Sequence, residues 1–150
     1  MDNNIPFPQA DDFDKIIQIL HFADDKDLND IHKISLRLGD ISDRQVSYYI
    51  SAAMFLGFIE IEDGKKVFSK QALEFKNKNT YMQNAELIST ILLNPVFNKT
   101  YVNSILFGQQ ELDVVVGILK QYYPNYSTAI YKRRSQTVLS WTNWVIKHLS

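Results

Sequence analysis

Few residues of this chain have the types and spacing that catalysis or metal binding needs. Its three histidines, His21, His32 and His148, are scattered, and no two of them have a spacing that would place both rings on one metal ion. The absence of cysteine excludes a disulfide framework, a thiolate zinc site and a cysteine nucleophile. A Gly-x-Ser-x-Gly motif, a phosphate-binding glycine loop and a dinucleotide fingerprint are also missing. The sequence therefore predicts no catalytic residue, no bound metal and no cofactor.

One short pattern resembles part of a nuclease site. Asp63-Gly64-Lys65 matches the Asp-x-Lys half of the restriction-type nuclease motif, and Asp43 lies upstream. Carboxylates and a lysine could hold Mg²⁺ and orient a water molecule. That motif needs a central strand of a mixed sheet, whereas here it falls on a turn. A Mg²⁺-dependent nuclease is therefore the weaker alternative.

Residues suited to DNA recognition follow Gly39. Arg44 could hold guanine by two hydrogen bonds and Gln45 could hold adenine, while neighbouring hydroxyls could donate to phosphates. Two lysines, just past the Asp63-Gly64 turn, could reach a flanking backbone or minor groove. The predicted DNA contacts in this half are Ser42, Arg44, Gln45, Ser47, Tyr48, Ser51, Lys65 and Lys66.

A second candidate surface lies near the C-terminus. Residues 131–150 contain four basic residues and no acidic residue. Cations, hydroxyls and helix starts are groups that bind phosphate, and Ser127 is a predicted helix cap. The turn at residues 124–126 would make this a second helix-turn-helix, whereas a solvated basic face on a core helix is the alternative. The predicted contacts here are Thr128, Lys132, Arg133 and Arg134.

The order of elements in the first half predicts how these residues are positioned. Asp11 or Asp12 should cap a first helix, Asp27 a second helix that ends at Gly39, and Ser42 a third that runs to about Leu56. Two β-capable runs joined by Asp63-Gly64 then predict a hairpin. Three helices followed by a hairpin are the order of a winged helix-turn-helix, in which the third helix enters the major groove. The hairpin side chains expected to pack on the helices are Phe58, Ile61, Val67 and Phe68.

The second half is predicted to be helical throughout. Apolar residues recur at helical spacing over residues 82–93, 95–107 and 111–122, and again towards the end of a segment that starts near Ser127. The predicted fold is mainly α with a minor β part: a winged helix-turn-helix over residues 1–80, followed by a helical bundle over residues 81–150 that packs on it.

Composition and charge restrict the function classes. At 150 residues with 45% apolar content, the chain can form one domain or two small ones, and no apolar run approaches the roughly 20 residues of a membrane span. Residues 1–4 lack the order of a signal peptide, so a cytoplasmic protein is expected. The net charge of −1 divides into −6 over residues 1–30 and +5 over residues 31–150. Residues 1–30, here called the acidic head, therefore precede a basic remainder that contains all the predicted DNA contacts. The alternative interpretation of this charge distribution is that the aspartates of the acidic head simply cap helices.

Two groups of residues form motifs. The first group is Asp43-Arg44-Gln45-Val46-x-Tyr48-Tyr49, Ala52-Ala53 and Leu56-Gly57, and the second is Arg133-Arg134-Ser135-Gln136-Thr137-Val138-x-Ser140-Trp141-x-x-Trp144. Together they resemble a little-characterised group of prokaryotic winged-helix domains, over a span from about Ile5 to Leu149. Related domains are often attached to, or encoded beside, restriction-modification or other DNA-processing proteins. The resemblance implies DNA recognition in service of another activity, such as the targeting of a nuclease.

Two classes of function remain open from the sequence. The first is a module that reads double-stranded DNA for a restriction-type or other DNA-processing system, with a homodimer as one option and a nuclease or related protein as partner. The second is a winged-helix domain for protein interaction or assembly that does not touch DNA. The cationic clusters favour the first class, whereas the acidic head and the near-zero net charge favour the second.

Overall fold

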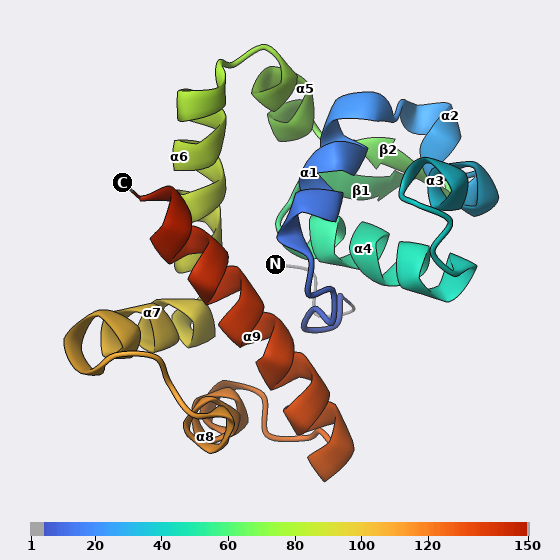
Figure 1. Cartoon of the computed structure of the whole chain (residues 1–150). Helices are drawn as coiled ribbons and strands as arrows, with labels where there is room; N and C mark the ends of the chain where they lie inside the picture. The colour runs from blue at the N-terminus through green and yellow to red at the C-terminus, as the bar shows by residue number, and fades with distance from the viewer. Residues whose placement is uncertain (1–4, 150) are drawn as a thin grey trace. The chain divides into compact units, whose positions relative to one another are not determined.

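The computed structural model describes residues 5–149, which are mainly helical with one two-stranded antiparallel sheet (Figure 1). This confirms the predicted fold class of mainly α with a minor β part. The chain divides into two compact units, one up to Gln83 and one from Asn84 onward. Residues 1–4, on which the signal-peptide expectation rests, lie outside the described residues. Within residues 5–149, no helix combines the length and the apolar character needed to cross a membrane.

The N-terminal unit begins with α1 (Phe13–Phe22), whose N-cap is Asp12. Asp12 Oδ1 accepts a hydrogen bond of 3.1 Å from the backbone N–H of Asp14, so one of the two predicted caps is confirmed. The buried side of α1 presents Phe13, Ile16, Ile19 and Leu20.

The predicted second helix is wrong in its start and its continuity. The structure has two short helices instead, α2 (Asp25–Leu28) and α3 (Ile31–Arg37). Asp24 caps α2 in a capping box with Asp27, and Asp30 caps α3 by accepting from the N–H of Lys33 at 3.2 Å. Aspartate competes well for backbone N–H groups at helix starts, and two such caps six residues apart divide the segment. Asp27 therefore lies inside α2 and does not start a helix.

A tight turn joins α3 to α4 (Asp43–Phe55). Gly39 and Asp40 have φ of 86° and 60°, and the Ser35 hydroxyl donates to the carbonyl of Ile41. Ser42 then caps α4, as predicted, and Val46, Ile50 and Ala53 face the core. The hydroxyl of Tyr49 accepts a 3.1 Å hydrogen bond from the N–H of Asp12, which ties α4 to the start of α1, and burial raises the pKa of this tyrosine.

The predicted hairpin is confirmed. Strands β1 (Ile59–Glu62) and β2 (Lys65–Phe68) pair antiparallel, with Glu62 opposite Lys65 and Ile61 opposite Lys66. Asp63 and Gly64 form the two-residue turn with φ of 52° and 75°, the conformation that an Asp-Gly pair favours.

The hairpin packs on the helices with a different set of side chains from the predicted one. Phe58, Ile59 and Phe68 are buried, and the ring of Phe58 meets that of Phe75 edge to face at 5.5 Å. Ile61, predicted to be in this face, is 54% exposed. It lies two residues nearer the turn than Ile59 on the same side of the strand, beyond the reach of the helical core.

The outer edge of β2 is covered by the segment that contains α2. The side-chain amide of Asn29 donates to the carbonyl of Lys66 at 2.9 Å and accepts from the N–H of Lys66 at 3.1 Å. Asp25 Oδ1 accepts from the N–H of Phe68 at 2.8 Å. These two side chains give β2 the hydrogen bonds that a third strand would otherwise supply.

Aspartates of the acidic head accept hydrogen bonds from nearby backbone N–H groups, as expected if they cap helices. Asp12, Asp24 and Asp30 accept hydrogen bonds at helix starts, and Asp25 holds the hairpin. Asp27 Oδ1 lies 2.7 Å from Lys33 Nζ, and Asp27 Oδ2 accepts from the N–H of Asp24 at 3.1 Å. The hydrogen bond from Lys33, with further help from Asp24, lowers the pKa of Asp27, and the same contact raises the pKa of Lys33.

The remaining helices are α5 (Lys70–Lys76) in the N-terminal unit, α6 (Thr80–Leu92), which runs across the division, and then α7 (Pro95–Phe107), α8 (Leu112–Tyr122) and α9 (Thr128–His148). In the C-terminal unit, α7 and α8 pack against the long α9 (Figure 1). Trp141 of α9 is fully buried and stacks on Phe97 of α7 with ring centroids 5.1 Å apart.

Removal of the Asn29 side chain should weaken the attachment of the hairpin. Asn29→Ala deletes two hydrogen bonds to Lys66, so we expect a loss of about 1–2 kcal/mol in the free energy of unfolding, measured by urea denaturation. Asn143→Ala, on the exposed side of α9, is the matched control and should leave stability nearly unchanged. Equal stabilities for the two variants would contradict this account.

The Asp27–Lys33 pair predicts a pH dependence of stability. A carboxyl whose pKa is lowered by folding stabilises the protein above its ordinary pKa of 3.8, and this stabilisation is lost as the pH falls through the lowered value. Asp27→Asn should therefore be less stable than the wild type at neutral pH, and the difference should shrink in acid. Urea unfolding across a pH series measures it, with Glu74→Gln on an exposed site as control. A difference that stays constant with pH would argue against the pair.

Candidate nucleic-acid interface

The start of α4 holds an organised pair of side chains. Arg44 is exposed, and its Nε donates a 2.8 Å hydrogen bond to the hydroxyl of Tyr48 one turn later. The guanidinium carbon also lies 5.6 Å from the centre of the Tyr48 ring. The two residues therefore share one face of the helix, as their spacing predicts, and the pairing restricts the arginine through Nε, without using its Nη groups.

Ser42 and Gln45 are occupied by the cap of the same helix. Ser42 Oγ accepts from the N–H of Gln45 at 3.1 Å, and Gln45 Oε1 accepts from the N–H of Ser42 at 3.3 Å. Two hydrogen bonds from glutamine to adenine need both its amide oxygen and its amide nitrogen. Gln45 would therefore have to leave this capping box before it could read adenine in that way.

The two remaining serines of this set differ in their surroundings. Ser47 is exposed on α4, so its hydroxyl faces solvent, whereas Ser51 is half-buried. Ser51 continues the stripe of Arg44 and Tyr48 at helical spacing. The structure thus brings Arg44 and Tyr48 into contact and leaves the serines as separate hydroxyls along the helix.

The lysines beyond the hairpin turn are placed differently from each other. Lys65 is exposed and lies opposite Glu62, while Lys66 is half-buried and lies opposite Ile61. Since successive side chains of a strand point to opposite faces, the two lysines do not share a surface. Asn29 fixes the backbone of Lys66, so the position of this strand is set from outside the hairpin.

The charge of each unit bears on phosphate binding. The residues up to Gln83 include 14 acidic and 10 basic residues, a net charge of −4. Those from Asn84 onward include three acidic and six basic residues, a net charge of +3. The positive excess therefore belongs to the C-terminal unit, while the unit that contains α4 is acidic overall.

In the C-terminal unit, a tyrosine cluster shapes the turn between α8 and α9. The hydroxyl of Tyr131 donates to the carbonyl of Tyr123 at 2.5 Å and accepts from the N–H of Tyr126 at 3.3 Å. Ser127 caps α9, as predicted, through a 3.3 Å hydrogen bond from the N–H of Ile130. Tyr131 is itself buried, so one hydroxyl holds both sides of this turn.

The predicted basic residues beyond this turn diverge around α9. Thr128 and Lys132 are exposed and one helical turn apart, so they share a face. Arg133 is half-buried, and its Nη1 donates to Thr137 Oγ1 at 3.4 Å. Arg134 is also half-buried, with its guanidinium carbon 4.3 Å from the centre of the Tyr126 ring. The structure therefore places Thr128 and Lys132 on one exposed face of α9, whereas the two arginines pack on Thr137 and Tyr126.

Tyr126 was not among the sequence-predicted site residues, although it determines where Arg134 lies. Its ring also stacks near that of Tyr123, with centroids 6.2 Å apart. The signal that could have indicated this cluster is the occurrence of four tyrosines, at positions 122, 123, 126 and 131, just before the three consecutive cations. Aromatic rings close to cations commonly form such stacked contacts.

The nuclease pattern lacks the geometry that its motif requires. Asp63 lies in the two-residue turn with positive φ, and Lys65 begins the edge of a two-stranded sheet. Asp43 lies 3.8 Å from His32, with Asp43 Oδ1 facing His32 Nδ1, and both side chains are exposed. Over residues 5–149, the structure brings no three histidine or acidic side chains together in a way that could hold a metal ion.

Comparison with known proteins identifies a family for this chain. The model of a domain of unknown function, DUF7226, matches residues 15–150. The chain belongs to the DUF7226 family. No curated protein and no solved structure matches it.

The DUF7226 match begins inside α1 and spans every residue predicted to contact DNA. The family domain therefore includes most of the N-terminal unit, from residue 15 onward, and all of the C-terminal unit. The cap of α1 at Asp12 lies before the matched range.

The tyrosine cluster predicts a specific loss of stability in the C-terminal unit. Tyr131→Phe removes the hydroxyl that links Tyr123 and Tyr126, and leaves the half-buried carbonyl of Tyr123 and N–H of Tyr126 without that partner. We expect a loss of about 1–3 kcal/mol in the free energy of unfolding, measured by urea denaturation. Tyr122→Phe, at a position 43% exposed, is the control and should change little. A Tyr131→Phe variant as stable as the wild type would refute the role of the hydroxyl.

Proposed function

We propose that this DUF7226 chain is a module that reads double-stranded DNA. In this proposal the N-terminal unit is a winged helix-turn-helix in which α3 and α4 form the helix-turn-helix, α4 enters the major groove and the β1–β2 hairpin is the wing. The module would act in the cytoplasm as the recognition part of a restriction-type or other DNA-processing system. Its partner would be a nuclease or a related protein, and a homodimer would suit a palindromic site.

The observation that carries this proposal is the Arg44–Tyr48 pair at the start of α4. The hydrogen bond from Nε to the tyrosine hydroxyl and the nearby ring restrict an exposed arginine before any ligand binds. An arginine ordered in this way loses less conformational freedom when it meets a base. Its Nη groups could donate to the O6 and N7 atoms of guanine, the commonest specific contact of arginine in the major groove.

Phosphate contacts in this proposal come from scattered groups. Lys65 and Lys66 at the hairpin and Ser47 on α4 would position the module, and Thr128 with Lys132 would provide a further contact on α9. Because the N-terminal unit has a net charge of −4, we expect non-specific DNA binding to be weak at physiological salt. Specific contacts would then account for a large share of the affinity.

A second candidate function is a protein-interaction or assembly domain. The net charge of −4 on the N-terminal unit favours it. So does α7, which leaves Val102, Ile105, Leu106 and Phe107 exposed over its last two turns. Exposed apolar residues that lie together on one helix are typical of protein contacts.

The experiment is a selection of the full-length chain on random DNA duplexes, followed by titrations of the enriched site. Arg44→Ala should relax base preference at one position and cost about 1–3 kcal/mol in binding. Lys65→Ala should weaken all sequences alike and reduce the slope of log affinity against log salt by about 0.9. Lys70→Ala, on an exposed lysine at the opposite end of the hairpin from the turn, is the control.

Two outcomes would count against DNA reading by α4. One is a selection that enriches no sequence, even at low salt. The other is an enriched site whose affinity and base preference are the same for the wild type, Arg44→Ala and Lys65→Ala. Either outcome would favour the assembly function.

A further inference from the structure

One edge of the hairpin has unpaired backbone groups. In an antiparallel pair, opposite residues alternate between those that bond each other and those whose N–H and C=O groups point outward. Ser69 donates to the carbonyl of Phe58, so these two opposite residues form a hydrogen-bonded pair. Every second pair along the hairpin is then also hydrogen-bonded, namely Glu60 with Val67 and Glu62 with Lys65. The backbone groups of Ile59 and Ile61 therefore point away from β2.

The contacts on the other edge support this assignment independently. Lys66, the partner of Ile61, exchanges both of its outward backbone groups with Asn29, and Phe68, the partner of Ile59, donates outward to Asp25. No described residue makes the corresponding hydrogen bonds to Ile59 or Ile61. In the N-terminal unit, β2 is thus covered by side chains. On β1, Ile59 is only 2% exposed, so the open part of the edge lies at Ile61, which is 54% exposed.

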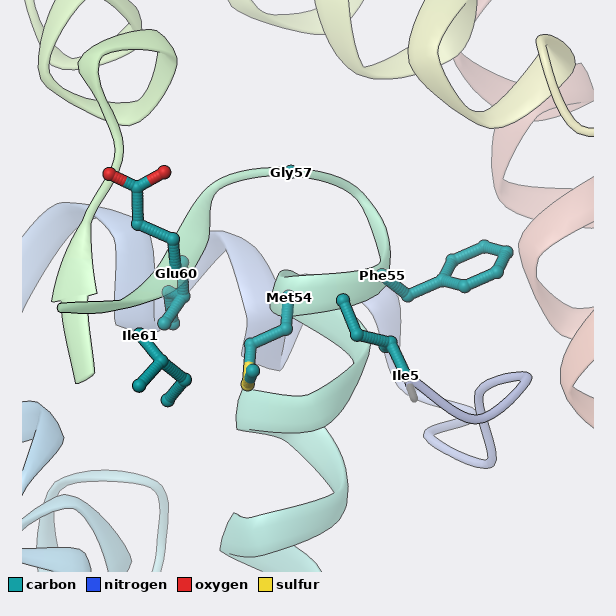
Figure 2. Close-up of a pocket in the computed structure, with 7 residues that line it drawn as sticks. Ile5, Met54, Phe55, Gly57, Glu60 and Ile61 are labelled. Atoms are coloured by element: carbon teal, nitrogen blue, oxygen red, sulfur yellow. The ribbon is translucent and has the colours of Figure 1, made fainter. Parts of the chain in front are cut away.

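A pocket lies along this open edge. It has a volume of about 370 Å³ and is lined by Ile5, the end of α4 at Met54 and Phe55, and β1. Figure 2 shows Met54 and Ile61 on the same side of the strand, whereas Glu60 points to the opposite side. The 54% exposed side chain of Ile61 borders the pocket, so apolar surface lies directly beside unpaired backbone groups.

The charge of the strand restricts what can pair with it. Glu60 and Glu62 are exposed on one face of β1, and Asp63 follows in the turn, while β1 contains no basic residue. A second copy of β1 would bring the glutamates of the two copies together, and like charges on paired strands are destabilising. An added strand would complement β1 if it carried cations on the face of Glu60 and Glu62 and apolar side chains on the face of Ile61.

We propose that the β1 edge binds an extended segment of a partner protein in which cationic and apolar residues alternate. The segment adds as a third strand beside the turn end of β1 and forms backbone hydrogen bonds with Ile61. Its apolar side chains enter the pocket beside Met54 and Ile61, and its cations lie near Glu60 and Glu62. This surface is separate from the Arg44–Tyr48 pair and does not depend on DNA binding by α4.

The test uses the full chain and an acetylated, amidated peptide of about seven residues, the usual length of a strand, in which Lys and Val alternate. Two further peptides have N-methyl groups on every Val or on every Lys, so each blocks the hydrogen bonds of one peptide edge at unchanged charge. Fluorescence titration should show that only one methylated peptide loses binding, by about tenfold or more. Hydrogen exchange should slow at the amide of Ile61 when the unmethylated peptide binds.

Variants of the protein test the same edge by changing β1 and not the peptide. Ile61→Pro removes an outward N–H without removing a bond to β2, and should weaken binding about tenfold relative to Ile61→Val. The double variant E60K/E62K should lose the Lys-Val peptide and gain an otherwise identical Glu-Val peptide. Arg44→Ala should bind the Lys-Val peptide as the wild type does, which separates this result from the outcome for DNA.

Three results would overturn the proposal. The first is equal binding of all three cationic peptides, which would indicate charge attraction without strand pairing. The second is slowed exchange at other amides with no change at Ile61. The third is equal binding of the Lys-Val peptide to the wild type and E60K/E62K.

Discussion

The exchange of hydrogen bonds between the Asn29 side chain and the backbone of Lys66 fixes the outer edge of the hairpin, on which the placement of both candidate surfaces of the hairpin depends. A two-stranded hairpin is marginal in water unless it packs against other elements. The buried side chains of Phe58, Ile59 and Phe68 provide that packing. Asn29 adds hydrogen bonds to it, together with the bond from Phe68 to Asp25, and these two residues lie between and within the two short helices. The same contacts cover the edge of β2, so a partner strand could meet the hairpin only at β1.

Local sequence signals predicted the elements whose causes are local. Ser42 with Gln45 marks the start of α4, and Asp63-Gly64 marks the hairpin turn, because each acts on backbone groups within three residues. The division between α2 and α3 was missed, since three aspartates competed as caps and hydrophobic spacing alone suggested one helix. The contact between Asn29 and Lys66 spans 37 residues, and no short-range pattern encodes it.

The candidate site was predictable to a similar degree. Arg44 and Tyr48 meet because helix geometry places residues four apart on one face. Arg133 and Arg134 separate for the same reason, since successive residues point about 100° apart around a helix, although in the sequence they form one basic run. Which cation would pack on an aromatic ring could not be predicted, because Tyr126 reaches Arg134 through a turn whose shape depends on the hydroxyl of Tyr131.

The cap of α4 also ranks the candidate base contacts against each other. A contact from Gln45 to adenine would release the N–H of Ser42 from Gln45 Oε1, so part of its binding free energy would be offset by a weaker helix start. Arg44 has no such conflict, because the hydrogen bond to Tyr48 uses Nε and leaves both Nη groups to donate. If α4 reads DNA, base preference should therefore depend mainly on Arg44, while Ser42 and Gln45 keep the helix start in the geometry that presents it.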